Sequence, residues 1–326
     1  MSVKNLLNVS LMRSLLELVL YKNSYFHQPH TADENAENPK ESFYYNLRGR
    51  LYYPGAFKNG LPIVYYGGLA FIHPVNVAYY GLAHLQYYWD TGESEYLTKA
   101  LHISRTMVEA GEEDQDGLVW RYPILLQGTH NWISAMAQGL LASLLLRVGL
   151  LVDDEWCLSK ANLALKPFLR VIPDGGVQTS LDGNIWFEEY ALPCPSYTLN
   201  GFIVALLAVR DGALLLGEKN YFFLYEEALN TLENTLARFD LRGWSRYDLI
   251  TANWGRLKIT NMASPFYHRF HIELLTILQK LTGRASFSAW RGRWESGLKS
   301  GMIFYRAIAE KVLFRLLMPV TKTMVY

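Results

Sequence analysis

The chain has 326 residues, of which 50% are hydrophobic, 19% charged and 14% aromatic, and its formal net charge is +1. This length allows one large domain or two ordinary ones, and the balance of 31 basic and 30 acidic residues excludes a nucleic-acid-binding protein that works by bulk positive charge. Two cysteines, Cys157 and Cys194, exclude a disulfide scaffold and a cysteine-rich metal site and suit a reducing compartment. The 22 tyrosines and 9 tryptophans pair apolar faces with polar tips, which favours sugar-like ligands.

The first 72 residues are expected to form an N-terminal helix and a tyrosine-rich extended arm. Residues 1–23 carry apolar side chains at helical spacing, but Arg13 and Glu17 interrupt them and no small-residue cleavage site follows, so no secretory signal is predicted. Residues 24–72 are polar and then rich in tyrosine, which is typical of an arm or hairpin that packs on a larger domain.

Residues 73–300 repeat one pattern and are expected to form the catalytic domain. An uncharged apolar stretch is followed by a more charged helical segment at residues 93–112, 153–170 and 218–238, and a fourth pair follows at 266–281 and 284–300. Between these units lie short segments typical of strands and turns, at residues 116–122, 175–187 and 243–248, of which the second contains the hairpin signal Asp182-Gly183.

Apolar inner helices, amphipathic outer helices and hairpins at one rim predict a mainly α fold, an incomplete (α/α)4 toroid. We expect the site in the rim cleft where inner helices begin. An irregular helical domain without closure is the alternative. Residues 301–326 are expected to form a C-terminal helical tail.

Three stretches lack charged residues altogether, at residues 59–89, 122–146 and 190–209, and by length each could span a bilayer. Each also contains several polar residues or prolines, which are costly in lipid, so we predict core helices and no transmembrane span. Residues 302–320 are basic and amphipathic, and a packing helix is favoured there over contact with a membrane surface.

Two clusters contain the residues best suited to chemistry. The first surrounds Glu188, Glu189 and Tyr190, and alternation along a strand predicts that only one of the two carboxylates enters a given cleft. The second joins Tyr247 to Tyr267 and its histidine neighbours. A carboxylate and tyrosines with shifted pKa values suit proton transfer. The alternative is that Glu189 caps a helix and Tyr267 closes a core.

Other chemistries have weaker support. His268 and His271 are three residues apart, but neither a His-Glu-x-x-His pattern nor a cysteine partner accompanies them, so no metal is expected. The sequence has no Gly-x-Ser-x-Gly elbow and no glycine-rich phosphate loop, so neither a serine nucleophile nor a dinucleotide cofactor is predicted, and we expect no cofactor at all.

These motifs resemble the D-glucuronyl C5-epimerase family, which converts D-glucuronate to L-iduronate within heparan-type polysaccharides. The most specific is W-F-E-E-Y-A-L-P-C-P-S-Y-T-L-N-G-F at residues 186–202, with further matches at 60–82, 131–139, 245–249 and 266–272. The resemblance implies an α/α toroid, here a short form without the β-sandwich that the animal enzymes insert. Two arginines of the animal enzymes are also replaced, by Ile250 and Ser264.

The resemblance implies roles for individual residues. Glu189 and Tyr267 would exchange the proton at C5 from opposite faces, with Tyr190 and Tyr247 in support. The residues expected to bind substrate are Tyr80, Trp132, Gln138 and Asn200 around the sugar, Arg121, Arg246, Arg256 and Lys258 as cations for its carboxylate, and His268 beside the tyrosines.

The expected partner is a uronic-acid polysaccharide and not nucleic acid, and a homodimer is left open. The expected location is the cytoplasm, with a membrane-peripheral position left open. A polysaccharide lyase begins with the same proton loss and is the second hypothesis. A glycoside hydrolase and a non-catalytic polysaccharide-binding protein are the others.

Overall fold

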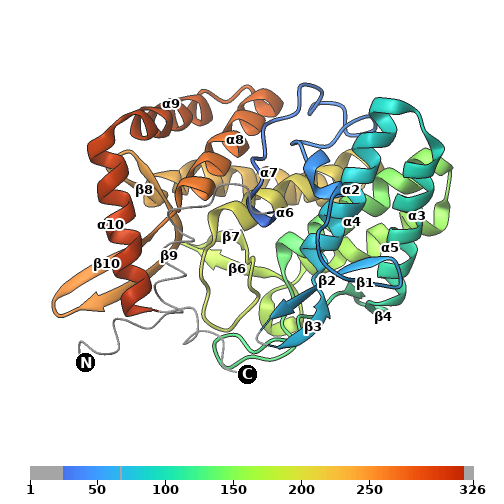
Figure 1. The fold of residues 1–326 in the computed structure, drawn as a ribbon, viewed down its shortest axis with the longest axis horizontal. Coiled ribbons are helices and arrows are strands. Elements are labelled where there is room, and N and C mark those ends of the chain that lie inside the picture. The colour runs from blue at the N-terminus through green and yellow to red at the C-terminus, as the bar shows by residue number, and fades with distance from the viewer. Residues whose placement is uncertain (1–24, 67, 319–326) are drawn as a thin grey trace.

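The computed structural model describes residues 25–66 and 68–318, and the helix expected within residues 1–23 lies outside them. The described chain is mainly helical with short strand hairpins, as the sequence predicts (Figure 1). Its helices are α2 (Pro74–Thr91), α3 (Ser94–Glu109), α4 (Ala135–Val152), α5 (Glu155–Leu165), α6 (Leu199–Asp211), α7 (Lys219–Thr235), α8 (Pro265–Thr282), α9 (Ala285–Lys299) and α10 (Gly301–Leu317).

The even-numbered helices α2 to α8 form an inner layer and pack in chain order, α2 on α4, α4 on α6 and α6 on α8. Each is followed by an outer helix, and the predicted four pairs are α2/α3, α4/α5, α6/α7 and α8/α9. Local signals set the ends of the inner helices. Pro74 and Pro265 occupy first turns, where a missing N–H costs nothing, and Gly92 and Gly283 end these helices with positive φ.

Two helical segments of the described chain are long and apolar enough to cross a membrane by length and composition, Ala135–Val152 and Leu199–Leu216. Within the fold, 83% and 72% of these segments are buried by other parts of the protein. A core helix of a globular protein passes the same test.

The strands form short antiparallel sheets, each placed just before an inner helix. They are β1 (Phe57–Lys58), β2 (Leu61–Tyr66), β3 (Leu69–Ile72), β4 (Glu112–Asp114), β5 (Gly117–Val119), β6 (Gln178–Leu181), β7 (Asn184–Phe187), β8 (Asp240–Leu241), β9 (Trp244–Trp254) and β10 (Leu257–Met262). The β6–β7 turn is the predicted one, with Asp182 and Gly183 both at positive φ. These sheets therefore gather at the end of the molecule where the inner helices begin.

The arm before β1 crosses between α8 and α2 in Figure 1 and is fixed to the inner helices. Its main anchor is a buried polar cluster, here called the junction, formed by Ser42, Tyr44, Ser143, Arg147 and Asp211. Arg147 and Asp211 are fully buried and their closest atoms, Nη1 and Oδ2, are 2.6 Å apart. Ser143 and Tyr44 donate hydrogen bonds of 2.7 Å to the same carboxylate, and Arg147 Nε donates to the Ser42 carbonyl at 3.0 Å.

Helix α10 lies along the long β9–β10 hairpin (Figure 1). Phe314 of α10 packs with Ala252 and Ile259, and Ile250 joins the same apolar cluster. Ile250 is thus used to attach this helix.

Candidate active site

A cavity of about 380 Å³ opens at the end where the inner helices begin. Its walls come from the arm, the β2–β3 hairpin, the first turns of α2, α6 and α8, and the loops before α4 and α6. Glu189, Tyr190 and Tyr267 all line it. Residues separated by more than 200 positions in sequence therefore share one pocket, at the rim where the sequence predicted a site.

The two adjacent glutamates after β7 have opposite surroundings, as strand alternation predicts. Glu188 is fully buried and accepts hydrogen bonds from Ser196 N (3.1 Å), Ser196 Oγ (2.9 Å) and Tyr197 N (2.9 Å), so it holds the loop that leads into α6. Glu189 points the other way and lines the cavity. The loop fixed by Glu188 thereby fixes the orientation of Glu189.

The Glu189 carboxyl group lies against the first turn of α6. A Cβ atom added to Gly201 would overlap the Cβ and Oε2 atoms of Glu189, so glycine is required for this approach. Asn200 Nδ2 donates to Glu189 Oε2 at 3.4 Å. Burial raises the pKa of Glu189 to about 7, while hydrogen bonds from Tyr190 and Asn200 act in the opposite direction. Near neutral pH the group can therefore give or take a proton.

Three tyrosines converge beside this carboxyl group. The hydroxyl oxygens of Tyr190 and Tyr247 are 3.3 Å apart, and the rings of Tyr247 and Tyr267 meet edge to face with centroids 4.8 Å apart. Burial, followed by the negative field of Glu189, holds the pKa values of Tyr190 and Tyr247 well above the usual tyrosine range, so both are neutral hydrogen-bond donors. Ser264 caps α8 and accepts from Tyr267 N at 3.4 Å.

A buried ionic network supports Tyr247 from behind. Lys311 of α10 lies 5.2 Å from the centroid of the Tyr247 ring and donates to Asn261 Oδ1 at 2.6 Å. Asn261 Nδ2 in turn donates to Asp248 Oδ2 at 2.6 Å. Burial lowers the pKa of Lys311 to about 7 and raises that of Asp248 to about 6. The sequence did not point to Lys311, because it lies in the segment expected to be a tail.

One wall of the cavity is aromatic. Tyr122 and Trp132 stack with their ring centroids 4.2 Å apart, and Phe71 packs near them. Trp132 Nε1 donates to the Ile124 carbonyl at 2.9 Å, which fixes the indole ring beside Tyr190. Flat apolar surfaces with polar edges suit the faces of sugar rings.

The structure thus brings together six of the residues expected at the site, namely Glu189, Tyr190, Tyr247, Tyr267, Trp132 and Asn200. Five of them line the cavity, and Tyr247 contacts two of these five, Tyr190 and Tyr267.

Three other residues expected at the site are corrected, because they serve the core. Gln138 is fully buried and links Trp120 N to the Leu118 and Ala164 carbonyls. His268 is fully buried between Ser245 and the Trp294 carbonyl, and it stacks on Trp244. Tyr80 packs against His84 and Phe57, and its neighbour Tyr79 lines the cavity instead.

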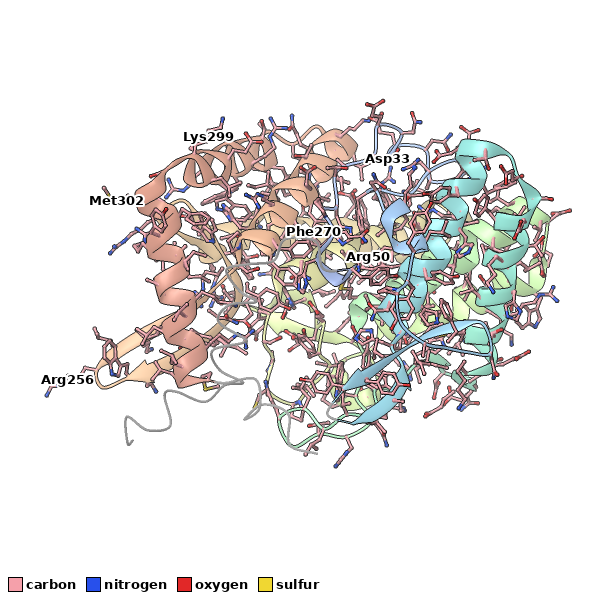
Figure 2. All side chains as sticks on the ribbon, in the orientation of Figure 1. Asp33, Arg50, Arg256, Phe270, Lys299 and Met302 are labelled. Atoms are coloured by element: carbon pink, nitrogen blue, oxygen red, sulfur yellow. The ribbon has the colours of Figure 1, made fainter. Side chains whose placement is uncertain are left out.

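The four cations expected for the substrate carboxylate do not line this cavity, which corrects that expectation. Arg121 is exposed and its Nε lies 2.7 Å from Glu112 Oε2. Arg246 extends from β9 and donates to the Arg238 carbonyl at 3.4 Å. Arg256 and Lys258 lie at the far end of the β9–β10 hairpin, where Figure 2 shows Arg256 well away from Arg50.

Sequence reasoning missed the contribution of the arm. Arg50, His27 and His30 line the cavity from it, and Tyr79, His73 and Asn76 line it from the start of α2. The tyrosine-rich composition of the arm predicted that it packs on the helices but gave no signal that it enters the site. Among the residues that the structure describes, no three His, Cys, Asp or Glu side chains cluster to hold a metal ion.

The pocket holds a titratable carboxyl group and tyrosines on a helical scaffold, which defines a candidate site for acid–base chemistry. The model of the D-glucuronyl C5-epimerase C-terminus matches residues 113–296, more than half of the chain. The chain therefore belongs to the family of D-glucuronyl C5-epimerase C-terminal domains.

The chain is also similar to individual known proteins. The chain is 33% identical over 176 residues to the D-glucuronyl C5-epimerase of Caenorhabditis elegans, a match that covers 50% of this chain and 28% of the nematode protein. It is 29% identical over 244 residues to an uncharacterised protein of Methanocaldococcus jannaschii, covering 66% of this chain and 77% of that protein. A glycoside hydrolase family 76 mannosidase of Bacteroides thetaiotaomicron superposes with a TM-score of 0.44 at 14% identity, over 75% of this chain and 70% of that one.

Proposed function

We propose that this protein inverts C5 of D-glucuronate to L-iduronate within a heparosan-like polysaccharide, and that Glu189 and Tyr267 exchange the proton at C5. Family membership supports an epimerase, and the carrying observation is that Glu189 and Tyr267 line one cavity from separate elements. The helix pairs that hold this cavity are, in this proposal, an incomplete (α/α)4 toroid.

The chemistry requires two proton-transfer groups. The hydrogen on C5 is α to the uronate carboxylate, so its removal leaves an electron pair that is delocalised into that carboxylate as an enediolate. One group of the pair accepts this proton and the other delivers a proton to C5 from the opposite face, so no net proton is consumed. Glu189, with a pKa of about 7, serves as acceptor in one direction and donor in the other.

The neighbouring residues support these transfers. Tyr190 and Tyr247 are neutral donors whose hydroxyl groups are 3.3 Å apart, and they are suited to hydrogen-bond the oxygens of the sugar or of the enediolate. The Tyr122–Trp132 stack forms part of the apolar wall against which the sugar ring would pack. Phosphate-binding loops and nucleophile elbows are not needed for this reaction.

The surroundings of the cavity suit a polymer better than a single sugar. A second hollow of about 500 Å³ shares Tyr190 and Leu126 with the cavity and continues past Tyr247 to Arg315 of α10. A chain bound across Tyr190 can therefore place neighbouring sugars on both sides of the reacting uronate.

The product formed from unsulfated glucuronate–glucosamine polymer in D₂O tests the function. Proton NMR is expected to show loss of the H5 signal and appearance of iduronate in an uncleaved chain. Ultraviolet-absorbing unsaturated ends would instead indicate a lyase, and new reducing ends a hydrolase. Binding without exchange would indicate a non-catalytic polysaccharide-binding protein.

Matched variants assign the residues. Tyr267→Phe is expected to abolish exchange, whereas Tyr80→Phe removes a hydroxyl from a tyrosine of the same fold that does not line the cavity and is expected to exchange at the wild-type rate. Full activity of Tyr267→Phe would refute the role proposed for Tyr267.

A further inference from the structure

Arg50 enters the active-site cavity from the arm. It belongs to a short 3₁₀ helix, Arg48–Leu51, and the residue is 3% exposed. Its Nη1 donates to the Tyr25 carbonyl at 2.6 Å, and its Nη2 lies 3.2 Å from His30 Nε2. The guanidinium carbon is 5.2 Å from the ring centroids of both Tyr25 and Tyr79. Arg50 is therefore held in a fixed place by the arm and by α2.

Of the described residues that line the cavity, Arg50 is the one arginine or lysine. The three histidines on the same walls are His27, His30 and His73, and burial lowers their pKa values to about 4, 3 and 4. They are neutral at pH 7. Among the described residues that line this cavity, the positive charge at neutral pH is thus the guanidinium group of Arg50.

Arg50 is also placed on the side of the cavity that contains Tyr267. Phe270, one turn after Tyr267 on α8, lines the same cavity, and Figure 2 shows Arg50 and Phe270 together at the centre of the molecule. His30, whose Nε2 lies 3.2 Å from Arg50 Nη2, packs on Phe270 with their ring centroids 4.8 Å apart. Arg50 therefore lines the same cavity as Tyr267, one of the two groups proposed to flank C5.

We propose that Arg50 binds the carboxylate of the reacting uronate, so that its charge stabilises the enediolate and orients C5 between Glu189 and Tyr267. This inference rests on the proposed function and adds the recognition of the substrate charge. A guanidinium group matches a carboxylate in geometry and charge. Because negative charge grows on the carboxylate oxygens as the C5 proton leaves, a fixed cation there lowers the barrier as well as improving binding.

Arg50 lies outside the segment of the chain that matches the family model, which begins at residue 113. Within the matched segment, Ile250 packs against α10 and Ser264 caps α8, and neither brings a charge to the cavity. The arm thus supplies a charge that these two positions do not. This is why the arm must be present for the site to be complete.

The test compares two polymers and four proteins. The polymers are the unsulfated glucuronate–glucosamine chain and its carboxyl-reduced form, in which every carboxylate is a hydroxymethyl group. The proteins are wild type, Arg50→Met, Arg50→Lys and Arg48→Gln. Arg48 belongs to the same short helix but ion-pairs with Asp90 at the surface, with Nη2 and Oδ1 2.6 Å apart, so it is the matched control.

Wild type and Arg48→Gln are expected to bind the native polymer about 10-fold or more tightly than the reduced polymer, which is the range for a hydrogen bond to a charged group. Arg50→Met is expected to lose that preference and to slow exchange about 100-fold or more. A folded Arg50→Met that keeps the preference would overturn the proposal.

If Arg50→Met does not fold, Arg50→Lys tests whether residue 50 binds the carboxylate. It keeps the charge but not the planar fork, so it is expected to keep the preference and to exchange about 10-fold more slowly. Loss of the preference while the charge is still present would contradict carboxylate binding. A wild-type protein that prefers the native polymer but shows no exchange would refute the proposed reaction without refuting the role of Arg50.

Discussion

The junction and the candidate active-site cavity each contain a buried carboxyl group, but the two groups differ in how closely their partners approach. At the junction, the Asp211 carboxylate receives Arg147 at 2.6 Å and the hydroxyl groups of Ser143 and Tyr44 at 2.7 Å. In the cavity, Glu189 is contacted by Asn200 at 3.4 Å and by the Tyr190 hydroxyl, and its pKa is raised to about 7. A buried charge with several close partners suits a structural role, whereas a poorly compensated one is easily protonated and so is suited to proton transfer.

The largest expected effect is a loss of folding stability when the junction is changed. Asp211→Asn leaves Arg147 buried without its counter-charge, and we expect the free energy of unfolding to fall by about 3–5 kcal/mol. Urea unfolding monitored by circular dichroism measures this. The double variant Arg147→Met/Asp211→Leu removes both charges and should cost less. A single variant as stable as wild type would show that the junction does not hold the arm.

Glu189→Gln tests the cavity, where the buried carboxyl group is expected to serve activity and not stability. Removing the titratable group is expected to slow exchange at C5 by about 10²–10⁴-fold, the usual contribution of a general acid or base. Stability should be unchanged or higher at pH 8, because an amide in the same place carries no charge to desolvate. Exchange kinetics and unfolding of the same preparation separate the two outcomes. Loss of activity together with loss of folding would contradict the contrast between the two regions.

The raised pKa of Glu189 also predicts how stability depends on pH. Between about pH 4.5 and 7 the folded protein keeps a proton that the unfolded chain has lost, so the free energy of unfolding falls as pH rises through this window. Burial raises the pKa of Glu188 to about 7 as well, so both carboxyl groups contribute. Glu189→Gln should show a shallower fall than wild type. Equal slopes from pH 4.5 to 7 would show that Glu189 is not shifted.

A smaller effect, on the pKa of Glu189, is expected when one of its hydrogen bonds is removed. Tyr190→Phe removes a hydrogen bond that favours the carboxylate, so the pKa of Glu189 should rise. The inflexion near pH 7 in the pH dependence of kcat/KM for exchange is then expected to move up by about 0.5–1 unit, in addition to any loss of rate. An inflexion that stays in place or moves down would contradict the hydrogen bond's role.

The smallest expected effect concerns the hairpin tip. Arg256→Ala and Lys258→Ala remove exposed cations that lie far from the cavity. Exchange rates within about twofold of wild type are expected for both. A large loss would place the polymer across the β9–β10 hairpin.

The sequence predicted the helix pairs and the hairpins because these depend on local periodicity and turn signals. It marked Glu189 and Tyr190 through a contiguous motif, whereas their grouping with Tyr247 and Tyr267 was implied by the family resemblance. It did not predict which buried polar residues are structural, since Gln138 and His268 satisfy hydrogen bonds set by distant carbonyl groups. Nor did it place Arg50, Tyr79 and Lys311, which reach the site through packing of the arm and of α10. Such long-range packing leaves no periodic signal in the chain.

Polymer labelled with deuterium at C5 tests most directly whether Glu189 and Tyr267 exchange the C5 proton. The measurement follows release of the label into water. We expect wild type to release deuterium with a primary isotope effect and to leave the polymer intact. Glu189→Gln and Tyr267→Phe are expected to bind the polymer without releasing deuterium. Release by either variant at the wild-type rate, or no release by a wild-type protein that binds the polymer, would contradict this role of the two residues.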